Sequence, residues 1–327
     1  MSIKIKGHTI SNVVLSTAMG HSGRGMRELF WSRDYQNVKK AIKRNKLTIF
    51  AKSSTYRKHK GNFRLFNPFT WGCIRRFGYN GMINAYGLTN DGTKVNAQKI
   101  ARAIEKGDNV IPNFYPQFAI GRRDAIEEAI YAMIEYDAYL RNYFWAVEFN
   151  FSCPNAEERI QENMQDALAC VSAVRREKPQ LCQIAKISIV HPHEFAQRLV
   201  DAGVDIVHAI NTIPHGLLSK GERENRKSPL WKYGGGGVSG GPIFPQAFAY
   251  NEELRKVIPK TPIIMGGGVT GPTQVRKYFA AGANAVSMCT AIRTCPVEAI
   301  NAINEYAAEE AAYEQIGEII NKAAFID

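Results

Sequence analysis

Short apolar segments recur along the chain and are separated by longer segments in which apolar residues return at helical spacing. The short segments are rich in Val, Ile, Ala and Phe, a composition that favours buried strands. Eight strands are predicted on this basis, at Val13–Ala18, Leu47–Ser53, Asn109–Phe114, Trp145–Ser152, Gln183–Ser188, Ile206–Thr212, Pro262–Gly267 and Ala285–Thr290.

The longer segments between the strands are amphipathic and predict helices. Eight strands that alternate with helices indicate an α/β fold, a single (β/α)8 barrel over residues 1–327 with long loops at its carboxyl face. A doubly wound open sheet is the alternative, but the number of strands and the lack of a linker favour the barrel. The helices are expected at Asp34–Arg44, Lys94–Glu105, Arg123–Leu140, Glu158–Glu177, His193–Ala202, Phe248–Val257, Thr273–Ala281 and Pro296–Ile320.

Polar side chains stand at the carboxyl ends of the predicted strands, where ligands bind in parallel α/β folds. Two of them are lysines, Lys52 and Lys186, and a buried lysine is costly unless it meets an anion or an electron-rich ring. A lysine that reaches solvent is the alternative for Lys52. The two lysines together with several asparagines predict a polar ligand; the further strand-end residues are Asn113, Asn150, Asn211 and Thr212.

The stretch Glu148–Asn155 joins the fourth predicted strand to the helix that follows it. Asn150 and Asn155 each carry a donor and an acceptor, which suits the edge of a planar ligand. Cys153 lies between them, and a thiol can accept or donate a proton. A helix cap at Asn155 and an inert buried thiol are the alternative interpretation.

Glycine-rich segments in the last third of the chain predict a phosphate site. Residues 234–241 contain six glycines before a helix, and Gly266–Gly268 and Met288–Thr290 end the last two strands. Glycines allow backbone N–H groups to approach a phosphate, and these last two loops are the usual phosphate cradle of such barrels. The long connection Tyr56–Thr93 is uncommon unless it is functional, and its Asn84 and Gly87 could cover a ligand from the side opposite Asn150.

The 327 residues include 42 Lys and Arg against 30 Asp and Glu, a net charge of +12 that favours anionic ligands, nucleic acid or an acidic surface. Basic residues are densest from Arg57 to Arg76, where contact with nucleic acid or lipid is open but a solvated loop is favoured. No segment is apolar enough to span a membrane, the first residues lack a signal-peptide core, and the cysteines show no metal or iron–sulfur spacing. We therefore expect a cytoplasmic protein with reduced thiols at Cys73, Cys153, Cys170, Cys182, Cys289 and Cys295.

Several short motifs occur in an order that resembles the class 1 dihydroorotate dehydrogenases, flavin-dependent (β/α)8 enzymes. Each motif is short, but together they are specific and cover roughly Val13 to Arg293. They are Ala51-Lys52-Ser53-Ser54-Thr55, Asn84 to Asn90, Asn150-Phe151-Ser152-Cys153-Pro154-Asn155, Ala185-Lys186-Ile187-Ser188, Asn211-Thr212, Gly237-Val238-Ser239-Gly240 and Gly266-Gly267-Gly268.

The resemblance implies FMN as cofactor and oxidation of dihydroorotate to orotate in pyrimidine biosynthesis. Cys153 would remove the proton from C5 while hydride leaves C6, and Lys186 would sit beside the flavin ring. The substrate contacts would be Lys52, Asn84, Gly87, Leu88, Asn150, Asn155, Asn211 and Thr212. The cofactor contacts would be Ala18, Gly20, Lys52, Ser53, Asn113, Asn150, Lys186, Ser239, Gly240, Gly267, Gly268, Cys289 and Thr290.

Some positions depart from that family. Cys289 stands where most class 1 enzymes have Gly. The related dihydropyrimidine dehydrogenases are similar to this chain at that position, so a related cyclic amide such as dihydrouracil is the alternative substrate. Those relatives have His where this chain has Asn155, which favours dihydroorotate. The segments Asn67–Arg76 and Pro214–Trp231 are unlike the family. The second is expected to close over the substrate, and its Ser219 and Ser228 are weaker candidates for the base.

The electron acceptor is open between fumarate, a quinone, and NAD reached through a separate electron-transfer subunit, because the chain has no Rossmann fingerprint of its own. The resemblance also implies a homodimer.

Overall fold

The computed structural model describes residues 2–26, 31–152, 163–219 and 227–323, with side chains through residue 309. A parallel sheet forms its centre, and the strands run in the order β7-β4-β3-β15-β14-β11-β10-β9-β8. These strands are β3 (Val13–Ser16), β4 (Thr48–Phe50), β7 (Asn109–Ile111), β8 (Asn113–Phe114), β9 (Ala146–Asn150), β10 (Cys182–Lys186), β11 (Ile206–Ala209), β14 (Ile263–Gly266) and β15 (Ala285–Met288).

The two ends of this sheet are halves of one predicted strand. β7 pairs with β4 and β8 pairs with β9, and only Pro112 separates β7 from β8. Proline has no N–H to donate, which interrupts the strand, although its carbonyl still accepts a hydrogen bond from the N–H of Glu148 at 2.9 Å. The sheet is therefore nearly closed as a barrel. All eight predicted strands are confirmed, and the open sheet is wrong.

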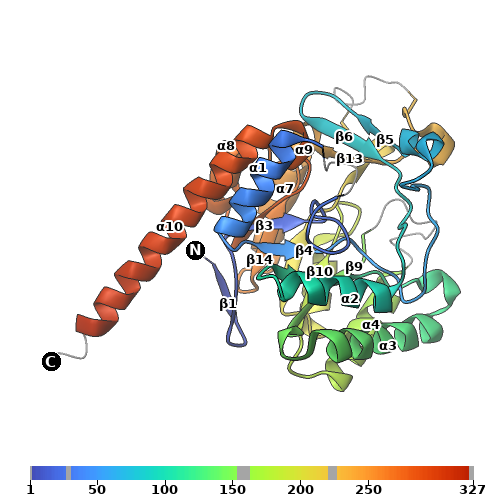
Figure 1. Ribbon diagram of the computed structural model, residues 1–327. Coiled ribbons are helices and arrows are strands. Elements are labelled where there is room, and N and C mark those ends of the chain that lie inside the picture. Colours follow the sequence, from blue (N-terminus) through green and yellow to red (C-terminus); the bar gives the residue numbers. More distant parts are fainter. Residues whose placement is uncertain (1, 27–30, 153–162, 220–226, 324–327) are drawn as a thin grey trace.

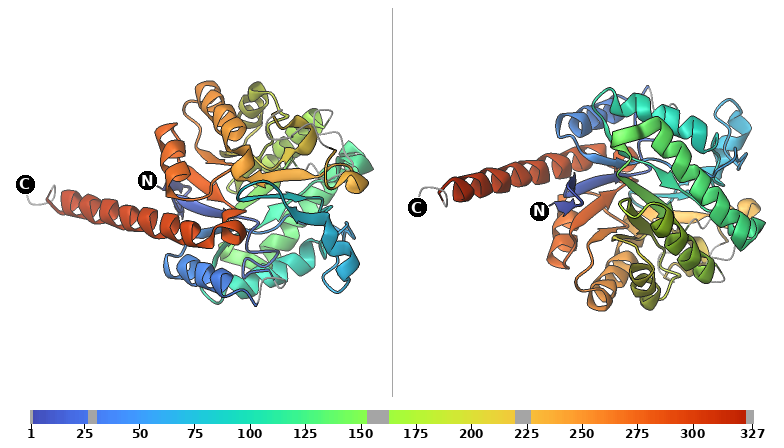
Figure 2. Two further views of the ribbon diagram at one scale, coloured as in Figure 1. Left: turned by 90° about the horizontal axis from the view of Figure 1, so that it is seen from above. Right: turned by 90° about the horizontal axis from the view of Figure 1, so that it is seen from below.

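Helices connect the strands and cover the outside of the barrel (Figures 1 and 2). α7 begins four residues before its predicted start, because Pro245 lies in the first helical turn, where a missing N–H costs nothing. The predicted residues 158–162 lie outside the described part of the chain. The helices are α1 (Arg33–Arg44), α2 (Thr93–Ile104), α3 (Arg122–Leu140), α4 (Met164–Glu177), α5 (His193–Asp201), α7 (Phe244–Val257), α8 (Pro272–Ala280), α9 (Ala291–Thr294) and α10 (Pro296–Ala323).

Two antiparallel sheets that the sequence pattern did not predict lie at the two ends of the barrel (Figure 1). A hairpin of β1 (Ile3–Ile5) and β2 (His8–Ile10) lies at one end. Across the other end runs a sheet in the order β12-β13-β6-β5, formed by Ile213–Pro214, Gly237–Gly240, Gly81–Asn84 and Ile74–Arg76.

The glycine-rich stretch 234–241 thus contains a strand, β13, rather than an open loop alone. Its pairing with β6 brings the two backbones very close, since a Cβ on Gly240 would stand 2.3 Å from the carbonyl oxygen of Asn80. Glycine inside a strand is often the mark of such an approach. The sheet covers the carboxyl ends of the barrel strands and forms the roof of the site.

A buried histidine in the loop after β10 gives the fold a pH dependence. His191 is 2% exposed, and its Nδ1 accepts a hydrogen bond from the N–H of Ser188 at 3.1 Å. Burial lowers the pKa of His191 to about 4. The folded pKa is below the unfolded value, so the stabilisation is complete above about pH 6.5 and is lost as the pH falls toward 4.

Replacing His191 with asparagine is expected to remove much of the loss of stability between pH 7.5 and pH 5. An asparagine oxygen can still accept from Ser188 but takes up no proton, which spares about 2 kcal/mol. Urea unfolding at the two pH values measures this, and the control is His8→Asn, at an exposed histidine on β2. Equal losses in the His191 variant and the native protein would contradict the assignment.

Candidate functional site

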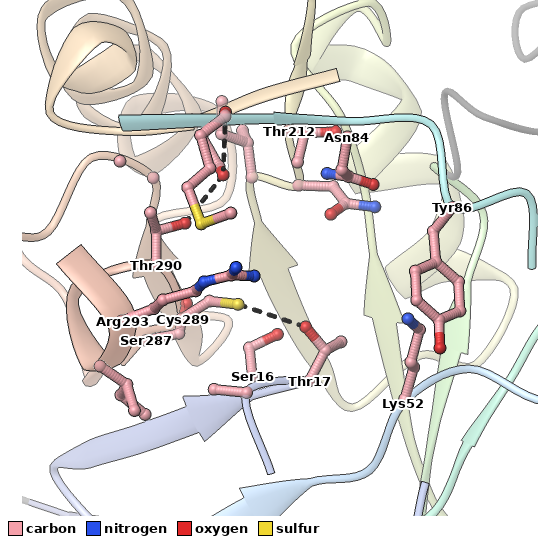
Figure 3. Close-up of a pocket in the computed structure, with 18 of the residues that line it drawn as sticks. Ser16, Thr17, Lys52, Asn84, Tyr86, Thr212, Ser287, Cys289, Thr290 and Arg293 are labelled. Atoms are coloured by element: carbon pink, nitrogen blue, oxygen red, sulfur yellow. Dashed lines mark hydrogen bonds between the residues drawn. The ribbon is translucent and has the colours of Figure 1, made fainter. Parts of the chain in front are cut away.

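A cavity of about 230 Å³ lies at the carboxyl ends of the barrel strands, under the β12-β13-β6-β5 sheet. Barrel strands and this roof supply side chains from widely separated parts of the sequence (Figure 3). It brings together most of the residues that the sequence predicts for the site: Ala18, Lys52, Ser53, Asn84, Gly87, Leu88, Asn150, Lys186, Asn211, Thr212, Ser239, Gly240, Gly267, Gly268, Cys289 and Thr290.

Two predicted residues in the described part of the chain, Gly20 and Asn113, do not line the cavity. Gly20 lies behind the wall, where its carbonyl accepts a hydrogen bond from the N–H of Lys52 at 3.0 Å. Asn113 is fully buried below the cavity and donates to the carboxylate of Glu148. Cys153 and Asn155 lie outside the described residues.

Lys52 meets the side chain of Tyr86 at one end of the cavity. Its Nζ lies 2.6 Å from the centroid of the Tyr86 ring, and Tyr86 in turn stacks on Phe63 with 4.8 Å between ring centroids. This is the electron-rich ring that a strand-end lysine was expected to need. The contact holds the Lys52 ammonium at the cavity wall, as Figure 3 shows, where it can meet an anionic group of a ligand.

Lys186 lies at the floor of the cavity and is only 4% exposed. Its Nζ donates a hydrogen bond to Ser16 Oγ, a cavity residue that the sequence analysis did not single out. A positive charge at this place can stabilise negative charge that develops on a bound ring.

A buried polar network below Lys186 was also missed. The two oxygens of Glu148 contact His208 Nδ1 and Asn113 Nδ2, and His208 Nε2 lies 2.8 Å from Ser287 Oγ. Glu148 and His208 have no exposed surface. The available signal was an ionisable residue inside each of two apolar strands, β9 and β11.

The charges of this network follow from its surroundings. Burial alone would raise the pKa of Glu148, but the Lys186 charge and the hydrogen bonds from His208 and Asn113 hold the pKa below its ordinary value. Burial lowers the pKa of His208 in spite of the adjacent carboxylate. A neutral His208 that donates from Nδ1 to Glu148 and accepts at Nε2 from Ser287 satisfies all three groups. Ionised Glu148 then balances the Lys186 ammonium.

The opposite end of the cavity suits a phosphate. Gly240, Gly267 and Gly268 present backbone there, and Thr290 Oγ1 donates to Ser239 Oγ at 2.8 Å. Arg293 of α9 lines the same end beside Cys289 and was missed by the sequence analysis (Figure 3). Glycine backbone, hydroxyl groups and a guanidinium are the donors that phosphate groups bind.

The middle of the cavity presents groups for the edge of a planar ring. Asn150 Nδ2 donates to Ser53 Oγ at 2.8 Å, and Asn211 Nδ2 donates to the carbonyl of Ser152 at 3.1 Å. The buried hydroxyl of Thr212 has no hydrogen-bond partner within the described parts of the chain. Because buried polar atoms are normally paired, this hydroxyl at the cavity wall fits a bound ligand.

The connection 214–231, which was expected to close over the substrate, is described at residues 214–219 and 227–231. The hydroxyl of Ser228 is engaged with the carbonyl of Gly235, and the N–H of Ser219 bonds the side chain of Gln246 at 3.1 Å. Neither serine lines the cavity. Residues 220–226 lie outside the described part.

Metal ligands do not gather in the parts of the chain that the structure describes, where no group of three or more His, Cys, Asp or Glu could hold an ion. The same described residues contain no helix of the length and apolarity that crossing a bilayer requires.

Comparison with known proteins places the chain in a family. The sequence profile of the dihydroorotate dehydrogenase family matches residues 2–308. The catalytic subunit of dihydroorotate dehydrogenase B (NAD(+)) from Brachyspira hyodysenteriae is 29% identical over 70% of this chain and 74% of its own length. That of Trichlorobacter lovleyi is 30% identical over 67% of this chain and 69% of its own length.

The fold has a solved counterpart as well. The crystal structure of the dihydroorotate dehydrogenase of Eimeria tenella in complex with ferulenol has a TM-score of 0.66 and 17% identity, and the match covers 99% of this chain and 85% of that one. At this level of identity the likeness supports the barrel fold alone.

Proposed function

Because the chain belongs to the dihydroorotate dehydrogenase family, and so to the oxidoreductases that act on CH–CH bonds, we propose that it oxidises (S)-dihydroorotate to orotate with FMN as cofactor. The observation that carries the proposal is the cavity itself. One end of the cavity has a lysine against an aromatic ring, and the other end has a glycine-rich phosphate cradle. The middle has ring-edge amides and a Thr212 hydroxyl that finds no partner among the described residues.

The residues of the cavity divide between cofactor and substrate. The cradle around Gly240, Gly267, Gly268 and Thr290 would hold the FMN phosphate, and Lys186 would place its charge beside the ring. Bound FMN would supply the acceptor for the hydride that leaves C6. The ring and carboxylate of the substrate would be held by Lys52, Asn84, Gly87, Leu88, Asn150, Asn155, Asn211 and Thr212.

Cys153 would act as the base. Its thiolate would take the proton from C5 of the substrate, so that one proton and one hydride leave and a C=C bond forms. An unperturbed thiol has a pKa of about 8.5, which makes part of it available as thiolate at mildly alkaline pH.

Family membership also suggests which other subunits this chain works with. The named relatives are catalytic subunits of NAD(+)-dependent enzymes. We propose that this chain is one FMN-binding barrel domain that works in the cytoplasm as a homodimer, with NAD reached through a separate electron-transfer subunit. Fumarate and a quinone are the alternative electron acceptors.

Lys52 is expected to select for a carboxylate on the ligand. Orotate and uracil differ only in the carboxylate at C6, so replacing Lys52 with methionine should weaken orotate binding by about 10- to 100-fold, the worth of a hydrogen bond to a charged group, and leave uracil binding nearly unchanged. Titration of the flavin absorption with each ligand measures both affinities. Tyr86→Phe is the matched control, because it keeps the ring under the ammonium. Equal weakening for orotate and uracil would contradict this role.

A further inference from the structure

The long connection between β4 and α2 carries large apolar side chains that stand in solvent. Phe66 is 90% exposed and Phe69 is 94% exposed, on either side of Pro68, and Trp71 is 46% exposed. They lie in and beside the short helix η2 (Pro68–Cys73), which sits at the edge of the molecule in all three views (Figures 1 and 2). Exposed phenylalanine is unfavourable in water unless something covers it, so side chains gathered in this way mark an interaction surface.

The connection holds these side chains in place. Asn67 caps η2 by accepting from the N–H of Phe69 at 3.2 Å, and the hydroxyl of Thr70 accepts from the N–H of Arg64 at 2.9 Å. The indole N–H of Trp71 donates to the carbonyl of Arg64 at 3.2 Å. The aromatic side chains are therefore presented by a hydrogen-bonded turn.

The charged residues in the chain segment around these aromatic side chains are all basic. From residue 53 to residue 90 the sequence contains six basic residues and no Asp or Glu. Arg57 and Lys58 reach carboxylates elsewhere, on Glu128 at 3.3 Å and Asp91 at 4.0 Å. The other four form no ion pair within the described residues; they are Lys60, Arg64, Arg75 and Arg76, and all four are exposed.

We propose that this aromatic–basic surface, formed by Arg64, Phe66, Phe69, Trp71 and Arg75, docks on the headgroups of an anionic phospholipid bilayer. Phenylalanine side chains can enter the boundary between headgroups and acyl chains, and nearby arginines bind the lipid phosphates. A protruding turn suits a broad surface, whereas binding of single-stranded nucleic acid uses a groove along which bases stack. Arg75 belongs to the turn because its Nε donates to the carbonyl of Gly72 at 3.2 Å.

The surface adjoins the cavity. Ile74 follows η2 directly and lines the cavity, and Phe63, next to Arg64, stacks on Tyr86. A bilayer that covers η2 would therefore lie at the side of the site where Tyr86 contacts Lys52.

The test is co-sedimentation of the full chain with vesicles at about 0.1 M salt, where long-range attraction between surface charges is screened. We expect sedimentation with equimolar phosphatidylglycerol and phosphatidylcholine but not with phosphatidylcholine alone. Arg64→Ser with Arg75→Ser should lower the affinity about 30-fold, at roughly 1 kcal/mol per arginine. Phe66→Ser with Phe69→Ser should lower it at least tenfold. Because Phe66 and Phe69 are almost fully exposed, their replacement should change the stability of the fold little. The phenylalanine variant therefore still tests the proposal if the arginine variant unfolds.

Two control variants separate this surface from diffuse basicity. Lys40→Ser with Lys43→Ser removes two exposed charges from α1, and Tyr143→Ser removes an aromatic side chain that is 63% exposed elsewhere. Both should bind vesicles nearly as the native protein does. The proposal is overturned if anionic vesicles sediment no protein, or if the α1 variant loses as much affinity as the arginine variant. Binding of generic single-stranded RNA without binding of vesicles would overturn it in favour of nucleic acid.

Discussion

Replacing Cys153 with alanine is expected to slow the reduction of the bound flavin by dihydroorotate about 100-fold or more. The reason is the loss of the base that takes the C5 proton, and the size is the usual one for a general base. The native rate should rise with pH through about 8.5, where a thiol ionises, and the variant should lose that rise. Anaerobic stopped-flow absorbance measures the rate, and binding of FMN and orotate should be retained.

Cys295→Ala is the matched control. This thiol is half-buried outside the cavity and donates to the carbonyl of Thr270 at 3.2 Å, so its loss should leave the rate and its pH dependence unchanged. A Cys153 variant that reduces its flavin at the native rate would place the base elsewhere. Ser228 would be a poor replacement, because its hydroxyl is engaged with Gly235.

Replacing Glu148 with leucine is expected to lower the free energy of unfolding by about 3–5 kcal/mol, the usual cost of removing one partner of a buried pair. The change leaves the N–H groups of His208 and Asn113 without their acceptor and removes a negative charge that interacts with the buried Lys186. Urea unfolding of the purified protein at neutral pH measures the loss.

Glu148→Gln separates the charge from the hydrogen bonds. Its side-chain oxygen can still accept from His208, so the loss should be clearly smaller than in the leucine variant. A leucine variant as stable as the native protein would show that the network is not needed for the fold. Glu127→Leu, at an exposed position of α3, controls for the added apolar side chain.

The barrel could be predicted from the sequence because each strand is a continuous apolar segment between amphipathic helices. The accessory strands could not, because two of the four residues of β13 are glycine and β5 contains two exposed arginines. Those strands form only because segments far apart in the sequence pair with each other over the barrel. The local pattern of apolar and polar residues does not reveal such pairing. The halves of the third strand were read as one, since Pro112 interrupts pairing without changing the apolar pattern.

Much of the candidate site was predicted for a related reason. Strand-end residues converge whenever the strands are parallel, so Lys52, Lys186 and Thr212 could be placed together without coordinates. Glu148 and His208 were missed because their side chains point into the barrel, a direction that the apolar neighbours do not reveal. Arg293 was missed because it follows its strand by a turn of helix. The roles of Cys153 and Asn155 stay predictions.

The most direct test of the account is an anaerobic visible spectrum of the purified protein before and after dihydroorotate is added. The account predicts a yellow protein whose flavin band near 450 nm, roughly where oxidised flavins absorb, is lost on addition of dihydroorotate but not of dihydrouracil. Reduction by dihydrouracil alone would assign the site to the related cyclic amide. A protein that neither contains nor takes up FMN would contradict the proposed function altogether.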